Sequence, residues 1–361
     1  MIDRNRIIQR LRQKLPQNKI DALLVSSKVN VRYASGFTGD DSMALVLSDR
    51  LVFLTDFRYV EQVGKECPGW TVYERGKLKM AEALANVVSD NKIGRLGLEA
   101  DHVSWGQFRG FGRAMPQVTL EPTVGLVEEL RRVKQPGEVA CIRRALATAQ
   151  HAFEQLKGTV QPGVSEKQLA DELERLMRQS GAQKSGFDTI MAFGPNASQP
   201  HARPGTRELG TDEGVLVDWG ASVEGYSSDL TRVLCAGRVP SKFDQLYRLV
   251  LDAQTAAIQA VRPGAPAADV DIAARQVITA AGYGPQFGHA VGHGVGLEVH
   301  EAPVVRTGGN DVQEPGMVFT IEPGVYIPGW GGIRIEDMIL VTETGCEVLS
   351  DLRKDPASIQ L

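Results

Sequence analysis

Apolar and polar positions in the first third of the chain follow two patterns, one typical of helices and one typical of buried strands. Residues 6–15 indicate a helix, and the short runs 22–25, 44–47 and 51–54 are apolar, with a polar turn between the last two. Apolar runs of this length bounded by turn residues are typical of buried strands, and the last two indicate a hairpin. Residues 93–98 indicate a further strand. The pattern predicts an α/β domain.

Proline and glycine indicate where this first domain ends. We place the boundary near Glu121-Pro122, so that the predicted domains span residues 1–122 and 123–361. Residues 126–133 are expected to form a linking helix, and Gln135-Pro136-Gly137 to form a break before the next helix. We interpret the helices that follow as scaffold.

Four acidic residues in the C-terminal half stand in surroundings that disfavour an unpaired charge. Residues 215–219 and 317–322 are apolar, β-branched or aromatic runs that indicate buried strands, each with one carboxylate near its end. Residues 226–233 and 333–340 follow after glycine-rich connections that are typical of hairpin loops. A buried carboxylate must be paired, neutralised or bound to metal. Each hairpin therefore offers two inward acids, which are Asp218 and Asp229 in the first and Glu322 and Glu336 in the second.

The two hairpins belong to what we interpret as two similar halves. Residues 160–163 and 261–264 share a Val-x-Pro-Gly pattern, and each follows one helical stretch and precedes another. Residues 213–218 and 315–322 then lead into the acid-bearing runs in a similar way. Repeated units of this kind pack against one another, so we expect the two halves to converge on one site.

The number and type of these side chains indicate metal binding. Four carboxylates carry more negative charge than one divalent ion offsets, but they suit two ions, and oxygen ligands with one imidazole favour Mn²⁺, with Co²⁺, Zn²⁺ or Fe²⁺ as alternatives. Arg232 and Arg334 are close enough in sequence to pair with single acids instead. Because the pattern recurs in two hairpins, we favour a shared metal site. Paired metals activate water, so hydrolysis is the expected chemistry.

Residues 288–303 hold half of the chain's six histidines, namely His289, His293 and His300. Glycines separate these histidines and would let the backbone approach a ligand closely. If one imidazole binds metal, the others are placed to donate a proton or to stabilise an oxyanion near neutral pH. His201 is a further candidate, although its spacing alone is that of an ordinary loop residue.

Together these motifs resemble the metallopeptidases with the pita-bread fold, above all their Xaa-Pro branch. The resemblance rests on Val217-Asp218-Trp219-Gly220, Ser228-Asp229-Leu230-Thr231-Arg232, Gly292-His293-Gly294-Val295-Gly296-Leu297, Glu322-Pro323-Gly324 and Arg334-Ile335-Glu336-Asp337. Residues 31–39 also resemble part of the family's N-terminal domain. The resemblance covers nearly the whole chain. It implies an α+β fold, with a smaller creatinase-like α/β domain before a C-terminal pita-bread (creatinase/aminopeptidase-like) domain.

The resemblance further implies a ligand set and roles for individual residues. Its two divalent metal ions map onto Asp218, Asp229, His293, Glu322 and Glu336. It implies that a hydroxide bridging the metals attacks the substrate and that Glu322 also shuttles a proton. By the same resemblance His300 would stabilise the tetrahedral intermediate, His201 would contact the substrate, and His289 and Arg334 would shape the substrate pocket.

The implied activity is that of an Xaa-Pro aminopeptidase, a metallo-exopeptidase that hydrolyses the bond between an N-terminal residue and proline. An Xaa-Pro dipeptidase (prolidase) is the alternative, and it must hold the free carboxylate after proline, for which a bidentate Arg is the natural partner. Arg203, Arg306 and Arg334 are candidates for that partner. A methionine aminopeptidase fits the N-terminal domain less well. Creatinase-like metal-free hydrolases usually lack ligands that this chain keeps.

Composition and charge exclude several other classes. A net charge of -4 and a pI near 5.9 argue against a broad nucleic-acid surface. The sequence contains no run of about 18 apolar residues, so no membrane span is expected. The charged start of the chain lacks the apolar region of a secretory signal, so a cytoplasmic location is expected. The chain's four cysteines form no CxxC pair and are expected to be small core or surface residues. The family resemblance implies a homodimer.

Overall fold

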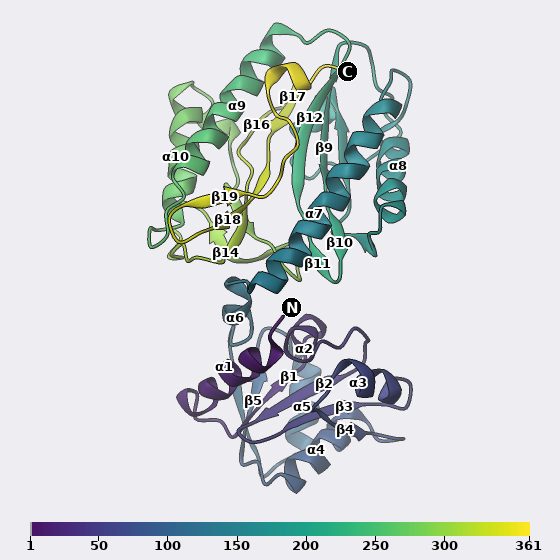
Figure 1. Ribbon diagram of the computed structural model, residues 1–361, viewed down its shortest axis with the longest axis vertical. Coiled ribbons are helices and arrows are strands. Elements are labelled where there is room, and N and C mark those ends of the chain that lie inside the picture. Colours follow the sequence, from purple (N-terminus) through teal and green to yellow (C-terminus); the bar gives the residue numbers. More distant parts are fainter. Residues whose placement is uncertain (1) are drawn as a thin grey trace. The chain divides into compact units, whose positions relative to one another are not determined.

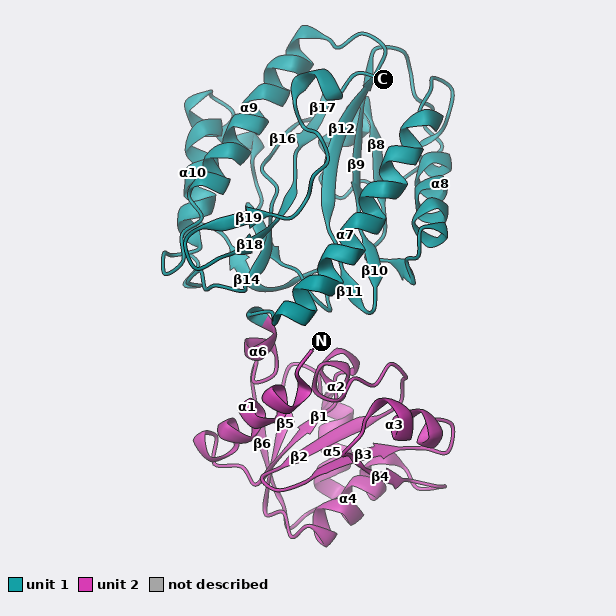
Figure 2. Cartoon of the chain, viewed as in Figure 1, with its two compact units in different colours: residues 1, 132–361 teal, residues 2–131 magenta. Residues whose placement is uncertain are grey.

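The computed structural model describes residues 2–361, which divide into two compact units (Figure 2). We refer to residues 2–131 as the N-terminal unit and to residues 132–361 as the C-terminal unit. Each unit combines helices with strands and has its own cluster of buried apolar side chains.

The boundary between the units falls between Arg131 and Arg132, later in the chain than the boundary expected near Pro122. Pro122 lies in strand β6 (Thr119–Thr123), which pairs in parallel with β5 (Arg95–Glu99). Proline is tolerated in β6 because this strand is at the edge of the sheet. The proline therefore belongs to the N-terminal sheet and marks no linker.

The N-terminal unit is a six-stranded sheet in the order β4-β3-β2-β1-β5-β6, flanked by helices (Figure 1). Strand β2 is antiparallel to β1 and β3, and the other neighbouring strands are parallel. The predicted first helix, hairpin and strands are confirmed. The remaining elements are β1 (Ala22–Val25), β2 (Met43–Leu47), β3 (Leu51–Thr55), β4 (Thr71–Glu74), α1 (Arg4–Gln17), α2 (Lys28–Ser35), α3 (Val60–Glu66), α4 (Met80–Asp90), α5 (Trp105–Ala114) and α6 (Glu128–Arg132).

The long helices of the C-terminal unit form two pairs, with the strands between them (Figure 1). One pair is α7 (Pro136–Leu156) with α8 (Glu166–Gln179), and the other is α9 (Ser241–Gln259) with α10 (Ala268–Ala280). Pro136 begins α7, because the first turn of a helix needs no N–H from that position. Short 3-10 helices are η1 (Lys157–Thr159), η2 (Gly194–Ser198), η3 (Gly284–Gln286) and η4 (Pro356–Ser358).

The strands of the C-terminal unit form four sheets, in the orders β12-β9-β8, β11-β10-β7, β14-β13-β15-β18-β19 and β16-β17. The strands of the first half are β7 (Lys184–Ser185), β8 (Ile190–Phe193), β9 (Glu213–Trp219), β10 (Ala221–Val223), β11 (Tyr226–Ser227) and β12 (Leu230–Ala236). Those of the second half are β13 (Gly292–Gly294), β14 (Glu301–Val305), β15 (Val318–Ile321), β16 (Gly324–Ile327), β17 (Gly331–Arg334), β18 (Asp337–Val341) and β19 (Cys346–Val348).

Both predicted hairpins are present, and each is broken into two ladders. In the first half β9 pairs with β12 and β10 with β11, while in the second half β15 pairs with β18 and β16 with β17. Asp229 lies in the break between β11 and β12, Glu322 directly follows β15, and Glu336 lies between β17 and β18. Asp218 lies on β9, opposite Thr231. Asp229, Glu322 and Glu336 therefore stand where regular pairing stops, whereas Asp218 lies within a paired strand.

Helix α7 holds the end of β9 that carries Asp218. The indole ring of Trp219 stacks on Phe153 with a ring-centroid distance of 4.3 Å, and its Nε1–H donates to the carbonyl oxygen of Ala149 at 2.9 Å. Trp219 is fully buried, so the polar end of its indole needs such a partner. This packing fixes the backbone beside Asp218.

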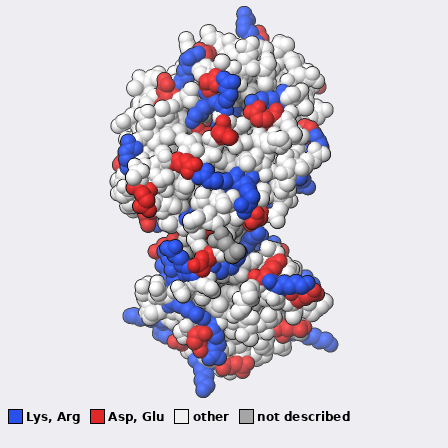
Figure 3. Space-filling view, in the orientation of Figure 1, with Lys and Arg blue, Asp and Glu red and all other residues white. Residues whose placement is uncertain are grey.

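Acidic and basic side chains are interspersed on the face of the molecule that Figure 3 shows. Among residues 2–361, no helix is long and apolar enough to cross a membrane. The cysteines Cys67, Cys141 and Cys235 are buried and Cys346 is half-buried, and all four are free thiols, as expected for small core residues.

Candidate active site

Nine residues singled out from the sequence line one cavity of about 220 Å³ in the C-terminal unit. They are Asp218, Asp229, His293, Glu322, Glu336, His201, His289, His300 and Arg334. The cavity thus brings together both hairpins, the loop that carries His201 and the run that carries His289, His293 and His300. The two halves of the C-terminal unit converge on one site, as the sequence pattern predicted.

The ring of His293 presents Nε2 to two acids. Its Nδ1 lies 3.1 Å from the carbonyl oxygen of Gly294, so Nδ1–H donates to that oxygen. Its Nε2 lies 3.5 Å from Asp229 Oδ2 and 3.3 Å from Glu322 Oε1. Atoms of Asp229, His293 and Glu336 that can bind metal all lie within 4.8 Å of one another. A histidine that ligates metal usually donates its other ring N–H to such a carbonyl, so His293 has the orientation of a ligand.

In two of the acids, one carboxylate oxygen accepts a hydrogen bond and the other has no partner among the described residues. Arg334 Nη2 donates to Asp218 Oδ2 at 2.5 Å, and Thr231 Oγ1 donates to Glu336 Oε2 at 2.7 Å. The other oxygens, Asp218 Oδ1 and Glu336 Oε1, are buried and have no hydrogen-bond partner among the described residues. A buried oxygen without a donor is costly. Divalent cations would satisfy both oxygens, so this donor set fits metal ions.

Burial raises the pKa of Asp218, Asp229 and Glu336. The rise is large for Asp229 and Glu336, because repulsion from neighbouring carboxylates adds to the effect of burial. Carboxylates this close cannot all ionise unless cations offset their charge. The protonation state of the cluster is therefore coupled to metal binding.

Glu322 differs from the other three acids. Burial alone would raise its pKa, but the hydrogen bond from His293 and the positive charges of His293 and Arg334 lower it to about 2. Burial lowers the pKa of His289 and, together with the charge of His293, that of His300. Glu322 is therefore ionised at neutral pH, while His289 and His300 are neutral imidazoles that can each donate one N–H.

Arg334 is buried, and each of its three guanidinium nitrogens donates to an acceptor within the protein. Besides Asp218, it donates through Nε to Thr231 Oγ1 at 3.0 Å and through Nη1 to Tyr326 Oη at 2.8 Å. The Tyr326 hydroxyl also lies 3.0 Å from His289 Nε2. This chain of contacts links His289 to Asp218 and keeps Arg334 engaged within the protein, so that Arg334 is poorly placed to hold a substrate carboxylate.

The glycines beside His293 serve close packing between strands, which differs from the expected approach to a ligand. A Cβ on Gly292 would come within 1.9 Å of the carbonyl oxygen of Thr320, and one on Gly294 within 2.2 Å of that of Ala302. Only glycine allows β13 to lie this close to its neighbours. The close packing fixes the backbone on both sides of His293.

The remaining histidines lie at the more open part of the cavity. His201 and His300 are exposed, and the rings of His300 and His293 have centroids 4.2 Å apart. Arg203 and Arg306 are exposed and are not among the residues that line the cavity.

Several residues of the site were missed in the sequence. Thr231 and Thr320 orient Glu336 and Glu322. Each threonine lies on a strand two residues from an acid, so period-two alternation could have indicated it. The apolar side chains that line the cavity carry no such signal, because they resemble ordinary core residues. Among them are Phe187, Ile190, Val299 and Val304.

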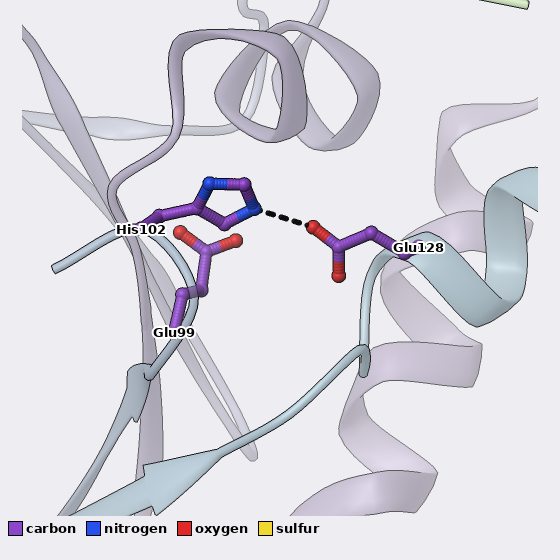
Figure 4. Close-up of side chains that lie close together, drawn as sticks. All are labelled: Glu99, His102 and Glu128. Carbon is purple, nitrogen blue, oxygen red and sulfur yellow. Dashed lines mark hydrogen bonds and ion pairs between the residues drawn. The ribbon is translucent and has the colours of Figure 1, made fainter. Parts of the chain in front are cut away.

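A second group of acids with a histidine lies in the N-terminal unit, and Figure 4 shows Glu99, His102 and Glu128. The oxygens of Glu99 accept hydrogen bonds from the backbone N–H of Ser27 at 2.8 Å and from Asn30 Nδ2 at 2.7 Å. His102 Nε2 lies 2.8 Å from Glu128 Oε1. Donors already occupy this group, which ties β5 and α6 to the start of α2.

Each of the two units matches a known protein family. Residues 140–343 match metallopeptidase family M24, and residues 7–133 match the Creatinase/Prolidase N-terminal domain. The first match covers more than half of the chain and contains all nine cavity residues named from the sequence.

Relatives similar over nearly their full length agree with these matches. The uncharacterized peptidase YqhT of Bacillus subtilis (strain 168) is 37% identical over 96% of this chain and 98% of its own. The structure of an Xaa-Pro dipeptidase from Bacillus anthracis has a TM-score of 0.96 at 38% identity, covering 99% of this chain and 100% of that one. An X-Pro aminopeptidase from Thermotoga maritima MSB8 has a TM-score of 0.90 at 33% identity, covering 95% and 99%.

These similarities confirm the α+β architecture expected from the motifs, a creatinase-like N-terminal domain followed by a pita-bread domain. They also agree with the cluster of acids and histidine that lines the cavity. The chain belongs to metallopeptidase family M24 and is a metallopeptidase.

Proposed function

We propose that this metallopeptidase is an Xaa-Pro aminopeptidase, which hydrolyses the bond between an N-terminal residue and a following proline. The observation that carries the proposal is the cavity, whose lining combines acids that have an oxygen without a hydrogen-bond partner with apolar side chains. The nitrogen of an Xaa-Pro peptide bond carries no hydrogen to donate, and the proline ring is rigid and apolar. Phe187, Ile190, Val299 and Val304 offer such a ring an apolar wall.

Asp218, Asp229, His293, Glu322 and Glu336 would hold two divalent ions in this proposal. Bound there, the ions would lower the pKa of a water molecule and polarise the scissile carbonyl group. Four carboxylates with one imidazole favour Mn²⁺, with Co²⁺, Zn²⁺ and Fe²⁺ as alternatives.

The other cavity residues bind and orient the substrate. Neutral His300 would donate an N–H to the oxygen that becomes negative as the carbonyl is attacked. Exposed His201 would contact the substrate from the opposite histidine-bearing segment. His289 and Arg334, linked through Tyr326, would shape the pocket, and Glu322 would move a proton between water and the leaving amine.

A longer peptide needs a site that stays open beyond proline. Arg334 is engaged with Asp218, Thr231 and Tyr326, while Arg203 and Arg306 do not line the cavity. The cavity therefore offers no unengaged guanidinium among its described lining residues to hold the carboxylate of a dipeptide. This favours an aminopeptidase. Similarity to the Bacillus anthracis Xaa-Pro dipeptidase keeps a dipeptidase as the second candidate.

Hydrolysis of Ala-Pro-Ala and Ala-Pro, each with added Mn²⁺ and with a chelator, tests the proposal. We expect metal-dependent cleavage of the tripeptide and little cleavage of the dipeptide. Cleavage of Ala-Pro alone would identify a dipeptidase instead. A Met-Ala peptide is the control, because its cleavage without cleavage of either proline peptide would indicate a methionine aminopeptidase. We also propose a homodimer in the cytoplasm, which gel filtration and cell fractionation would test.

A further inference from the structure

Each of the two histidine-bearing segments of the cavity is hydrogen-bonded to its own buried acid, and neither acid lines the cavity. The first segment, residues 193–205, carries His201, and the second, residues 291–307, carries His293 and His300. Glu166 of α8 serves the first segment, and Asp271 of α10 serves the second.

Glu166 ties both ends of the first segment with one carboxylate. Its Oε1 accepts the backbone N–H of Phe193 at 2.9 Å and Nδ2 of Asn196 at 2.8 Å, while its Oε2 accepts the backbone N–H of Gly205 at 3.0 Å. The side chain is 1% exposed. All of these donors belong to the segment that carries His201, so the carboxylate sets the path of the backbone on both sides of that histidine.

Asp271 does the same for the second segment. Its Oδ1 accepts the backbone N–H of Val291 at 3.0 Å, and its Oδ2 accepts the backbone N–H of Thr307 at 2.9 Å. Arg275 pairs with Asp271 and donates to the carbonyl oxygens of Phe287 at 2.7 Å and His289 at 2.9 Å. The pair therefore fixes the start and end of the segment as well as the backbone of His289.

The two acids stand at different positions of the repeat. Aligning the Val-x-Pro-Gly patterns at 160–163 and 261–264 places Glu166 opposite Ala267, so the acids are not one residue kept in two copies. Each nevertheless lies in the first turn of its helix, where an anion is favoured. Burying a carboxylate is costly unless strong hydrogen bonds compensate, so its use at both segments calls for a reason.

We propose that Glu166 and Asp271 are positioning residues, which hold the histidine-bearing segments at the spacing that the reaction needs. Glu166 acts through His201, and Asp271 acts through His293 and His300. The effect on catalysis rests on the proposed function, but the effect on the backbone does not.

Amide hydrogen exchange of the metal-free protein tests the positioning of the first segment without using activity. In Glu166→Gln the carboxamide NH₂ must face a donor at one end, so Gly205 or Phe193 loses its acceptor. We expect exchange of that amide to become faster by about tenfold or more. Glu172→Gln is the matched control, because Glu172 pairs with Arg175 on the same helix and away from the segment. Unchanged exchange in Glu166→Gln would overturn the proposal.

A double-mutant cycle tests whether Glu166 acts through His201. We expect Glu166→Gln to lower kcat/KM for Ala-Pro-Ala by about 10- to 100-fold, with metal content unchanged. In a His201→Ala background the same change should have little further effect. Additive losses would show a general effect on folding and would overturn the proposal. If the wild-type protein cleaves no proline peptide, the proposed function fails, while the exchange experiment still decides the positioning role. If Glu166→Gln does not fold, Glu166→Asp keeps the charge and reaches only one end.

Asp271→Asn distinguishes the two segments, because only the second segment carries a predicted metal ligand. We expect faster exchange at Val291 or Thr307 and loss of bound Mn²⁺ after dialysis, whereas Glu166→Gln keeps its metal. Asp269→Asn, an exposed change on the same helix, is the control. Full retention of metal and of amide protection in Asp271→Asn would overturn the role of Asp271. If that variant does not fold, Arg275→Lys tests the same pair through exchange of residues 287–291.

Discussion

Arg334 holds Asp218 by a single oxygen, with Nη2 donating to Oδ2 at 2.5 Å while Oδ1 has no hydrogen-bond partner in residues 2–361. Thr231 holds Glu336 in the same way. One oxygen of each acid is oriented by the protein and the other remains available. Orientation by a neighbouring side chain commonly tunes a metal ligand, so the predictions below begin with these two donors.

Replacing Arg334 with Met should destabilise the metal-free protein. The change leaves the carboxylate of Asp218 buried without its positive partner, which should lower the free energy of unfolding by about 3–5 kcal/mol. Urea unfolding in the presence of a chelator would measure the loss. Arg143→Met is the control, because Arg143 pairs with Glu347 at the surface and should cost only about 0–1 kcal/mol. Equal, small losses would mean that the Arg334–Asp218 pair contributes little.

Replacing Thr231 with Val should weaken metal binding with little change in shape. The variant removes the hydroxyl that donates to Glu336 and accepts from Arg334, so the affinity for Mn²⁺ should fall by about 10- to 100-fold. Competition with a coloured chelator would measure it. Thr255→Val removes a hydroxyl that bonds only within α9, and it should leave the affinity unchanged. Wild-type affinity in Thr231→Val would mean that Glu336 needs no such orientation.

Much of the site could be predicted because its acids stand in short apolar runs. A carboxylate such as Asp218 between Val217 and Trp219 conflicts with its surroundings, and the conflict is visible in the sequence. The breaks in the hairpins beside Glu322 and Glu336 were not visible, since they depend on where pairing stops between strands.

Residues that act from behind the site left no local signal. Glu166 looks like an ordinary first-turn acid of a capped helix, and only the folded chain shows its contacts with Phe193 and Gly205. The compact units divide later in the chain than Pro122 suggests, for a related reason. Pro122 suggests a break when read alone, but its strand pairs with residues 95–99, which are distant in sequence.

Replacing Phe187 with Ala should weaken the preference for proline. Phe187 lines the cavity, and the smaller side chain removes apolar contact with the pyrrolidine ring. We expect kcat/KM for Ala-Pro-Ala to fall by about tenfold or more, with a smaller loss for Ala-Ala-Ala. Parallel kinetics on the two tripeptides would measure the ratio. An equal loss on both peptides would mean that Phe187 contributes to general substrate binding or to folding and does not select proline.

Metal binding should strengthen as pH rises, and the direction follows from the acids of the cluster. Burial and repulsion between carboxylates raise the pKa of Asp229 and Glu336 well above their ordinary values, so in the metal-free protein these two acids keep protons that metal binding must displace. Calorimetric titration with Mn²⁺ in buffers of different ionisation enthalpy should therefore show proton release. Binding that releases no protons and has the same affinity across roughly pH 5 to 8 would contradict the raised pKa values.

The same acids predict how the stability of the metal-free protein changes with pH. A carboxyl whose pKa is higher in the folded than in the unfolded state stabilises the fold fully below its unfolded pKa. That contribution is lost as pH rises through the folded pKa, because the folded state must then bury additional negative charge. Glu322, with a pKa lowered to about 2, stays ionised from mildly acidic to neutral pH, so it does not change the stability over that range. The Tm of the chelator-treated protein should therefore fall from mildly acidic to neutral pH, and Glu336→Gln should reduce that fall because it removes one of the groups that must lose a proton.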